Sequence, residues 1–382
     1  MPYFHIDTEA YQESKRIGAP CGDTFLVRRS VYHTTIILAD GIGSGIKAHI
    51  ASQMSVSRLA QLLEGGASLR DAFFNVVGTM SKWRDHTMPF SAFLLMRVLN
   101  DGTTTILSYE MPASLLISRR EVNVIGADPL VVPAGIASES HFHLLPSEGV
   151  LLISDGIVQA GMGKNFHLGW GVEGVETFLS SCVGKDIDFH RVAQGVIEQA
   201  NYHDGAHSGD DKTVLLVHGR AGLVVDVLTG PPADSGRDGV VADGFWAAKG
   251  FKVICGATTA DIMARYAGRK VEVEQKPVSF STPPRYFIQG VDMVTEGAIT
   301  LMQAYNIIEE EGIIAKDRSA AGDLVSLLQH ADFVRFTVGL ARNPANSDIV
   351  YRKQGILPRD KIVPLLAQKL ERMGKLVTVT FV

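Results

Sequence analysis

The sequence predicts an α+β sandwich over residues 1–220, followed by a smaller α/β domain over residues 221–382. Short apolar, β-branched segments recur before residue 220, and helical stretches interrupt them in pairs. After residue 220, strands and helices alternate, which is typical of a mainly parallel sheet. A chain of 382 residues is also longer than one hydrophobic core usually serves.

The strands and helices of the first domain follow from their periodicity. Residues 25–29 and 31–40 are β-branched and partly alternating, which predicts two strands. Residues 46–64 have apolar positions near helical spacing, and a second helix over 68–83 begins at a suitable Ser68 cap. Later strands are expected at 91–99, 103–109, 150–156 and 212–219, and later helices at 175–182 and 189–201.

In the second domain, strands and helices are expected to alternate along the sequence. A strand at 223–228 precedes a helix at 239–249, and a strand at 252–256 precedes a helix at 259–267. Residues 290–311 are expected to form one long helix. Residues 227–236 form a loop after a strand, and residues 253–268 contain a strand, a turn and a helix that Thr258 or Thr259 can cap. If the two loops lie at the same sheet edge, they would frame a pocket for a small anionic ligand. Ordinary turn and capping chemistry is the interpretation that these residues favour.

Composition excludes several classes of function. The net charge of −5 lacks the basic excess of a nucleic-acid-binding surface. The three cysteines are far apart and form no CxxC pair, which argues against a disulfide framework or a zinc site. Neither a signal peptide nor a membrane-length apolar run is found, so we expect a cytoplasmic protein without a membrane partner. The oligomeric state stays open, a homodimer included.

Acidic residues beside glycines mark the ends of four predicted strands. If these strands are neighbours, the carboxylates converge, and they can all stay ionised only with cations among them. Oxygen ligands suit Mg²⁺ or Mn²⁺, and two such ions can activate a water for attack on a phosphate ester. The acidic residues are Asp23, Asp40, Asp155 and the Asp210-Asp211 pair.

Asp-Gly is also a common turn dipeptide, so each pair alone is weak evidence. Asp101-Gly102 is expected to be a hairpin turn, and Asp204-Gly205 is open to the same interpretation. That turn would leave His203 and His207 as exposed loop histidines, although their spacing could bind a metal on a helix. Gly41, Gly43 and Gly45 lack the spacing of a nucleotide-binding loop.

Four segments resemble the signature blocks of the protein phosphatase 2C superfamily, most closely its bacterial branch typified by the stage II sporulation protein E phosphatase. They are GDTFLVRR (22–29), ADGIGSGIKA (39–48), LLISDGIVQA (151–160) and SGDDKTVLLV (208–217). Their order and spacing match over roughly residues 15–220. The second domain resembles, less closely, the extra domain of such phosphatases encoded beside iron-only hydrogenases.

The resemblance implies an αββα sandwich with two metal ions between its sheets. Asp40 would bridge the metals, the Gly41 carbonyl would hold one, and Asp155 and Asp210 the other. Asp23 would act directly or through water, and the choice between Asp210 and Asp211 stays open. Arg28 and Arg29 are weak candidates for binding phosphate, since only one of them can point towards the site.

The implied activity is that of a protein-serine/threonine phosphatase using Mn²⁺ or Mg²⁺ on a phosphoprotein in bacterial signalling. The second domain would regulate it or bind a ligand. The alternative is a catalytically silent phosphatase fold that senses or binds through its C-terminal domain.

Overall fold

The computed structural model describes residues 3–16, 18–83, 90–182, 188–205, 209–273, 286–308, 319–341 and 357–382. The chain forms two compact units, Tyr3–Ala221 and Gly222–Val382. Each unit mixes helices and strands, which confirms the α+β class. The roles assigned to the two predicted domains remain predictions.

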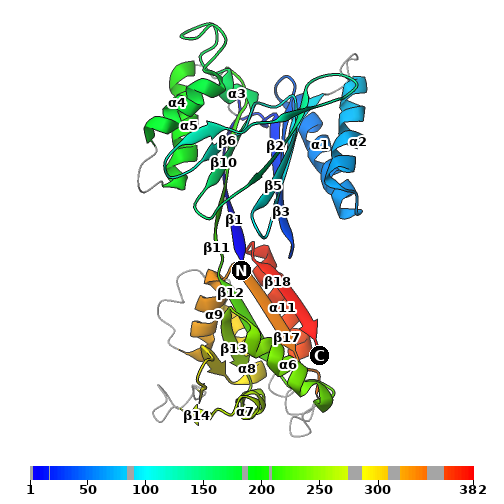
Figure 1. The fold of residues 1–382 in the computed structure, drawn as a ribbon, viewed down its shortest axis with the longest axis vertical. Coiled ribbons are helices and arrows are strands. Elements are labelled where there is room, and N and C mark those ends of the chain that lie inside the picture. The colour runs from blue at the N-terminus through cyan, green and yellow to red at the C-terminus, as the bar shows by residue number, and fades with distance from the viewer. Residues whose placement is uncertain are drawn as a thin grey trace. The chain divides into compact units, whose positions relative to one another are not determined.

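Two antiparallel sheets form the centre of the first unit (Figure 1). The six-stranded sheet has the order β2 (Asp23–Arg29), β3 (His33–Gly41), β4 (Ser91–Leu99), β5 (Thr103–Tyr109), β9 (Ala137–His143) and β8 (Asp128–Leu130). The five-stranded sheet has the order β1 (Phe4–Glu13), β11 (Lys212–Ala221), β10 (Gly149–Ile153), β6 (Leu115–Ile117) and β7 (Val122–Val124).

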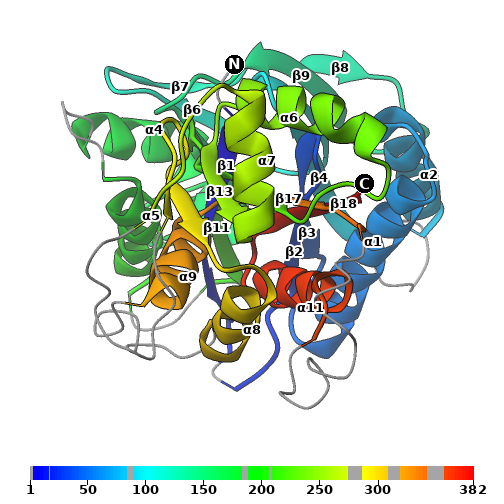
Figure 2. The same cartoon turned by 90° about the horizontal axis from the view of Figure 1, so that it is seen from below.

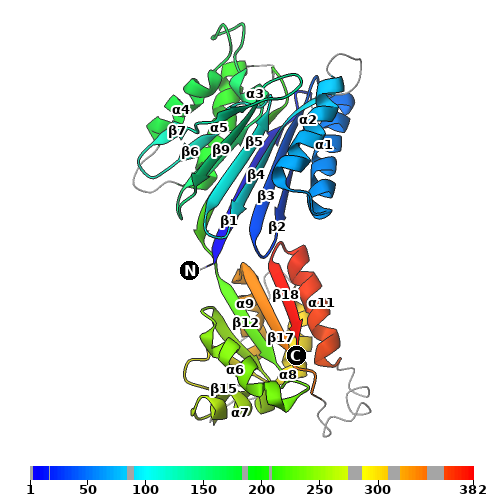
Figure 3. The same ribbon diagram turned by 45° about the vertical axis from the view of Figure 1, so that its right-hand side comes forward.

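Helix pairs cover the outer face of each sheet (Figure 3). Helices α1 (Ile46–Glu64) and α2 (Leu69–Trp83) pack on the six-stranded sheet. Helices α4 (Gly171–Cys182) and α5 (Phe189–Asp204) pack on the five-stranded sheet, and the short α3 (Asp155–Val158) follows β10. The resulting αββα order is the architecture that the resemblance implied.

Strand β3 shows why the sequences of the central strands are continuous apolar runs. Ile36 and Leu38 point into the core between the two sheets, whereas Ile37 and Ala39 pack under α1 and α2. Because both faces are covered, apolar residues occupy both sets of alternate positions in the middle of the strand. Helix α2 begins as predicted, with the Ser68 hydroxyl accepting a hydrogen bond from the backbone N–H of Asp71 at 3.1 Å.

The second unit is a doubly wound sheet with helices on both faces. Helices α6 (Asp238–Ala247) and α7 (Ala257–Tyr266) cover one face, and α8 (Gly297–Ile307), α9 (Ala320–His330) and α11 (Arg359–Arg372) cover the other (Figure 2). The strand order is β14 (Glu272–Val273), β15 (Tyr286–Phe287), β16 (Met293–Thr295), β13 (Phe251–Cys255), β12 (Val224–Thr229), β17 (Phe333–Val338) and β18 (Leu376–Phe381). The five strands from β16 to β18 are parallel.

One sequence prediction is wrong in this unit. Residues 290–311 do not form one long helix, because residues 293–295 form strand β16 and helix α8 begins only at Gly297. Met293, Val294 and Thr295 pair with β13, so the tertiary pairing prevails over the local helical pattern. Residues 309–311 lie outside the described residues.

None of the helices described has both the length and the apolar character needed to span a bilayer.

The six-stranded sheet should depend strongly on Phe93, which is fully buried between Phe73 and Tyr109 at ring distances of 5.4 and 5.6 Å. Phe93→Ala should lower the free energy of unfolding by about 3–5 kcal/mol, because it removes packed surface and leaves a cavity. Urea unfolding would measure the loss. Val131→Ala is the control, since Val131 is 97% exposed and its truncation should change stability by less than about 0.5 kcal/mol.

Candidate functional site

Asp23 and Asp40 lie directly opposite each other on neighbouring strands. Asp23 begins β2, Asp40 lies near the end of β3, and the two are register partners. Asp23 is 2% exposed and Asp40 is 7% exposed. Like charges at such a pair are destabilising even in water, and burial makes the repulsion stronger.

The second sheet brings its acidic residues to the same end of the sandwich. Asp155 follows β10 as the first residue of α3, and Asp210 and Asp211 precede β11. Two hydrogen bonds align these strand ends. The Ser154 N–H donates to the Thr213 carbonyl at 3.0 Å, and the Thr213 N–H donates to the Ser154 hydroxyl at 2.8 Å.

Hydrogen bonds across the sandwich hold the two sets of carboxylates together. Asp211 accepts the backbone N–H of Gly22 at 2.9 Å with one oxygen and that of Lys15 at 2.7 Å with the other. The Gln12 side-chain amide donates to the Asp23 carbonyl at 3.1 Å and to the Thr213 hydroxyl at 3.0 Å. The loop before β2 is thereby fixed to the start of β11.

The glycines beside these acids are needed for close approach rather than for turns. A Cβ atom on Gly41 would collide with the Ala48 carbonyl of α1, and one on Gly156 would collide with the Asp211 carbonyl. A Cβ atom on Gly22 would lie 2.7 Å from an Asp211 carboxylate oxygen. None of the three glycines has a positive φ, so packing alone requires them.

Burial and mutual repulsion disfavour the charged carboxylates. Burial, followed by the charges of Asp23 and Asp155, raises the pKa of Asp40 well above its usual range. Burial also raises the pKa of Asp23 to about 6. Burial and the charges of Asp155 and Asp211 raise the pKa of Asp210. The Lys15 ammonium group lies 3.7 Å from Asp210 and opposes this rise in the pKa of Asp210.

The orphaned oxygens of Asp23 fit a site for hard cations. Both are buried, and neither has a hydrogen-bond partner among the described residues. Carboxylate oxygens from two rigid sheets, together with the backbone carbonyl of Gly41 directly after Asp40, suit Mg²⁺ or Mn²⁺. Within the described ranges, however, no three His, Cys, Asp or Glu side chains already form a metal-ligand group.

Asp204 is buried and does not belong to a simple turn. It ends α5 and accepts hydrogen bonds from the backbone N–H groups of Gly161 and Gly209, at 2.8 and 3.0 Å. It also pairs with the buried Lys212 at 2.5 Å. The sequence shows the Asp-Gly dipeptide but not this burial, so the turn interpretation misses the residue.

The other candidates from the sequence lie away from the carboxylates. Arg28 is exposed and pairs with Glu64 at 4.0 Å, and Arg29 donates to the Ile6 carbonyl at the far end of β2. His203 is not an exposed loop residue, because it lies in α5 and packs against Phe166 at 4.9 Å. His207 lies outside the described residues.

The loops after β12 and β13 meet at one edge of the second unit's sheet, since these strands are parallel neighbours. The expected capping role of Thr258 or Thr259 is wrong, because α7 has no side-chain cap. The Thr259 hydroxyl instead accepts the backbone N–H of Gly230 at 3.0 Å, which ties the two loops together. The anionic ligand predicted there stays a prediction.

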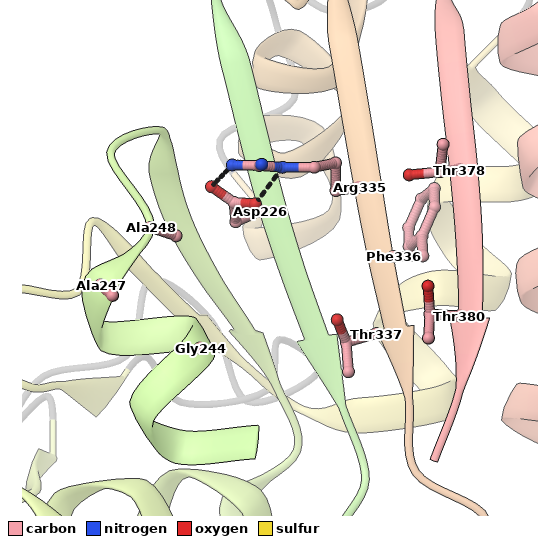
Figure 4. Close-up of a pocket in the computed structure, with 9 residues that line it drawn as sticks. All are labelled: Asp226, Gly244, Ala247, Ala248, Arg335, Phe336, Thr337, Thr378 and Thr380. Carbon is pink, nitrogen blue, oxygen red and sulfur yellow. Dashed lines mark hydrogen bonds and ion pairs between the residues drawn. The ribbon is translucent and has the colours of Figure 1, made fainter. Parts of the chain in front are cut away.

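A cavity of about 340 Å³ in the second unit lies between α6 and the strands β12, β17 and β18 (Figure 4). Asp226 and Arg335 form a two-point ion pair on its floor, with N–O distances of 2.6 and 2.9 Å. The rest of the lining is Gly244, Ala247, Ala248, Phe336, Thr337, Thr378 and Thr380. No residue of the loops 227–236 or 253–268 lines this cavity.

Removing one buried charge should stabilise the metal-free protein. Because the folded pKa of Asp23 is about 6 and the unfolded value is near 4, its ionised form costs stability above pH 6. Asp23→Asn should raise the free energy of unfolding at pH 7 by about 1–3 kcal/mol. The gain should shrink between pH 6 and pH 4, where wild-type Asp23 becomes protonated in the folded and then also in the unfolded state.

Chemical unfolding of chelator-treated protein at several pH values would measure this effect. Asp101→Asn is the matched control, since Asp101 also precedes a glycine but caps the exposed turn before Thr103. If Asp23→Asn instead lowers the free energy of unfolding at pH 7, the negative charge of Asp23 is already stabilised by its surroundings in the metal-free protein, which would contradict the prediction.

A comparison with known protein families finds a match within the first unit. Residues 31–220 match the family model described as stage II sporulation protein E (SpoIIE). This range contains Asp40, Asp155, Asp210 and Asp211, and Asp23 lies before it. No curated protein matches the chain.

Solved structures with a similar fold share little sequence with this chain. The phosphatase domain and regulatory fragment of SpoIIE from Bacillus subtilis is 19% identical with a TM-score of 0.48, over 58% of this chain and 65% of that one. The RsbU and RsbW domains of a Mycobacterium tuberculosis protein are 16% identical with a TM-score of 0.48, over 64% and 68%. The S. agalactiae serine/threonine phosphatase is 13% identical with a TM-score of 0.43, over 56% and 99%.

The chain thus spans slightly less than two thirds of the length of the B. subtilis structure. With identities this low and TM-scores below 0.5, the assignment rests on the family match and on the αββα order of the first unit. That unit is a member of the stage II sporulation protein E family of PP2C-type phosphatases.

Proposed function

We propose that this protein is a metal-dependent serine/threonine protein phosphatase that hydrolyses phosphoserine or phosphothreonine in a bacterial signalling partner. The observation that carries the proposal is the convergence of acidic side chains from both sheets at one end of the sandwich, where burial and mutual repulsion raise the pKa of Asp23, Asp40 and Asp210. A buried like-charge cluster is costly, and divalent cations are the simplest partners that would offset it.

The geometry supports a role for each acid. The charges of both Asp23, on the neighbouring strand, and Asp155, from the other sheet, act on Asp40, which suits a bridging ligand. Asp155 receives a hydrogen bond from the Gln159 amide at 2.7 Å on one oxygen, which orients the other. The Gly41 carbonyl would complete the set.

Of Asp210 and Asp211, we propose Asp210 as the direct metal ligand. Asp211 uses both carboxylate oxygens for the backbone N–H groups of Lys15 and Gly22. Asp210 accepts the backbone N–H of Asp211 at 2.9 Å and lies 3.7 Å from the Lys15 ammonium group. Asp210 is therefore proposed as the direct ligand, and Asp211 as the residue that holds the loop before β2.

Two bound Mn²⁺ or Mg²⁺ ions would supply an activated water and neutralise the phosphoryl oxygens. The protein's own contribution is to hold the ligands on rigid strand ends and to keep them buried. Lys15 lies at the partly exposed rim of this cluster, with its backbone anchored on Asp211. We propose that its ammonium group contacts a phosphate that approaches the site.

The alternative of a catalytically silent phosphatase fold has less support. Every acid expected for the site is present. The charges of Asp23 and Asp155 act on Asp40, and those of Asp155 and Asp211 act on Asp210. The second unit, Gly222–Val382, is proposed as the regulatory or ligand-binding part, with the cavity beside α6 as one place for a ligand.

Hydrolysis of p-nitrophenyl phosphate and of a phosphothreonine peptide should require Mn²⁺ or Mg²⁺. Asp40→Asn and Asp155→Asn should each lower the rate by more than about 100-fold, since even residues that only support metal ligands typically cost about 10- to 100-fold. Asp101→Asn should leave the rate unchanged. Metal-independent turnover, or full activity in either site variant, would contradict the proposal.

Lys15→Met should affect substrate binding more than metal binding. Loss of a charged hydrogen bond to phosphate should raise KM for p-nitrophenyl phosphate roughly tenfold. The Mn²⁺ concentration for half-maximal activity should change little, because Lys15 supplies no metal ligand. Steady-state kinetics at varied substrate and varied Mn²⁺ separate the two effects, and an unchanged KM would exclude a contact between Lys15 and phosphate.

A further inference from the structure

A fully buried lysine follows directly after the acidic pair of the site. Lys212 is 0% exposed, and its ammonium group pairs with Asp204, which is 3% exposed, at 2.5 Å. It also donates a hydrogen bond to the Asn201 side-chain carbonyl at 2.9 Å. Lysine is almost never buried so completely without partners, and here both partners lie on the last turn of α5.

Asp204 links three separate segments around this lysine. Its carboxylate accepts the Gly161 N–H after α3 and the Gly209 N–H before Asp210. Its backbone carbonyl accepts a hydrogen bond from the Lys164 ammonium group. The end of α5, the loop after α3 and the segment before β11 are therefore fixed to one another through a single residue.

The ion pair also borders the segment that carries Asp155. A Cβ atom on Gly156 would lie 3.3 Å from the Lys212 side chain and would collide with the Asp211 carbonyl. With no free space between these segments, a shift of Lys212 displaces both Asp210, two residues before it, and Asp155, one residue before Gly156.

Stability alone does not account for this arrangement. Lys212 lies on the face of β11 that packs under α4 and α5, where its neighbours Val214 and Leu216 are apolar. A buried ion pair is often no more stable than apolar residues of similar volume, because both charges must be desolvated. What the pair adds is directional hydrogen bonding, which fixes the backbone on both sides of the acidic residues.

We propose that the Asp204–Lys212 ion pair is a positioning device that sets the distance between Asp155 and Asp210 for cation binding. This inference rests on the proposed metal-dependent function. Neither residue touches substrate or metal. Both act through the backbone, Asp204 on the segments at Gly161 and Gly209, and Lys212 on the start of β11.

The test compares metal affinity with stability in the full chain. The double variant Asp204→Asn/Lys212→Met keeps the packed volume and removes both charges, so the metal-free protein should unfold within a few degrees of wild type. Its Mn²⁺ affinity, measured by calorimetry, should fall about 10- to 100-fold, as is typical when residues behind metal ligands are changed. A merely structural pair would leave the affinity of a stably folded variant unchanged.

Arg70→Met/Glu139→Gln is the matched control. It removes another ion pair with a buried carboxylate, between α2 and β9, and should leave Mn²⁺ affinity unchanged. If the first double variant does not fold, Asn201→Ala removes only one partner of Lys212 and should still weaken Mn²⁺ binding several-fold. The proposal is overturned if the folded test variant, Asp204→Asn/Lys212→Met or Asn201→Ala, binds Mn²⁺ as tightly as the wild type. An equal loss of Mn²⁺ affinity in the control variant overturns it too.

The outcomes also separate this inference from the proposed function. Mn²⁺ binding by the wild type without phosphate hydrolysis would contradict the phosphatase function and leave the positioning role supported by the affinity data. A wild-type protein that binds no Mn²⁺ would overturn both.

Discussion

The buried pair of Asp23 and Asp40, opposite each other on β2 and β3, is the constraint on which the rest of the first unit depends. Neither backbone can move apart without breaking the sheet, and neither carboxylate can turn to water. The charge must therefore be removed by protonation, as the raised pKa values indicate, or balanced by cations. A fold that keeps such a pair gives up stability in its metal-free state, which is typical of functional sites.

The surrounding structure limits how the acids can rearrange. Gly41 and Gly22 let α1 approach the ends of β3 and β2 through Ala48, so this helix packs directly behind two acids. The His49 ring strengthens the contact through a hydrogen bond with the Cys21 carbonyl at 2.9 Å. On the opposite sheet, Gly156 likewise allows close packing against the Asp211 backbone carbonyl. Close backbone packing, rather than side-chain bulk, thus determines where the carboxylates lie.

Much of this could be predicted from sequence because the signals are local. Acidic residues beside glycines predicted the ends of four strands, and convergence of their carboxylates followed if those strands were neighbours. The buried Asp204 could not be distinguished from a turn, since its partners at Gly161 and Lys212 are remote or unremarkable in sequence. Strand β16 was missed because three residues carry too little periodicity to oppose a helical pattern that continues after them.

The central claim is that divalent cations occupy the space among these carboxylates. A crystal structure of the protein grown with Mn²⁺, with anomalous scattering recorded at the manganese edge, tests it most directly. The account predicts two anomalous peaks within bonding distance of Asp23, Asp40, Asp155 and Asp210, with Asp211 still bound to the backbone of Lys15 and Gly22. Strong peaks elsewhere on the protein, or an empty cluster at saturating Mn²⁺, would contradict it.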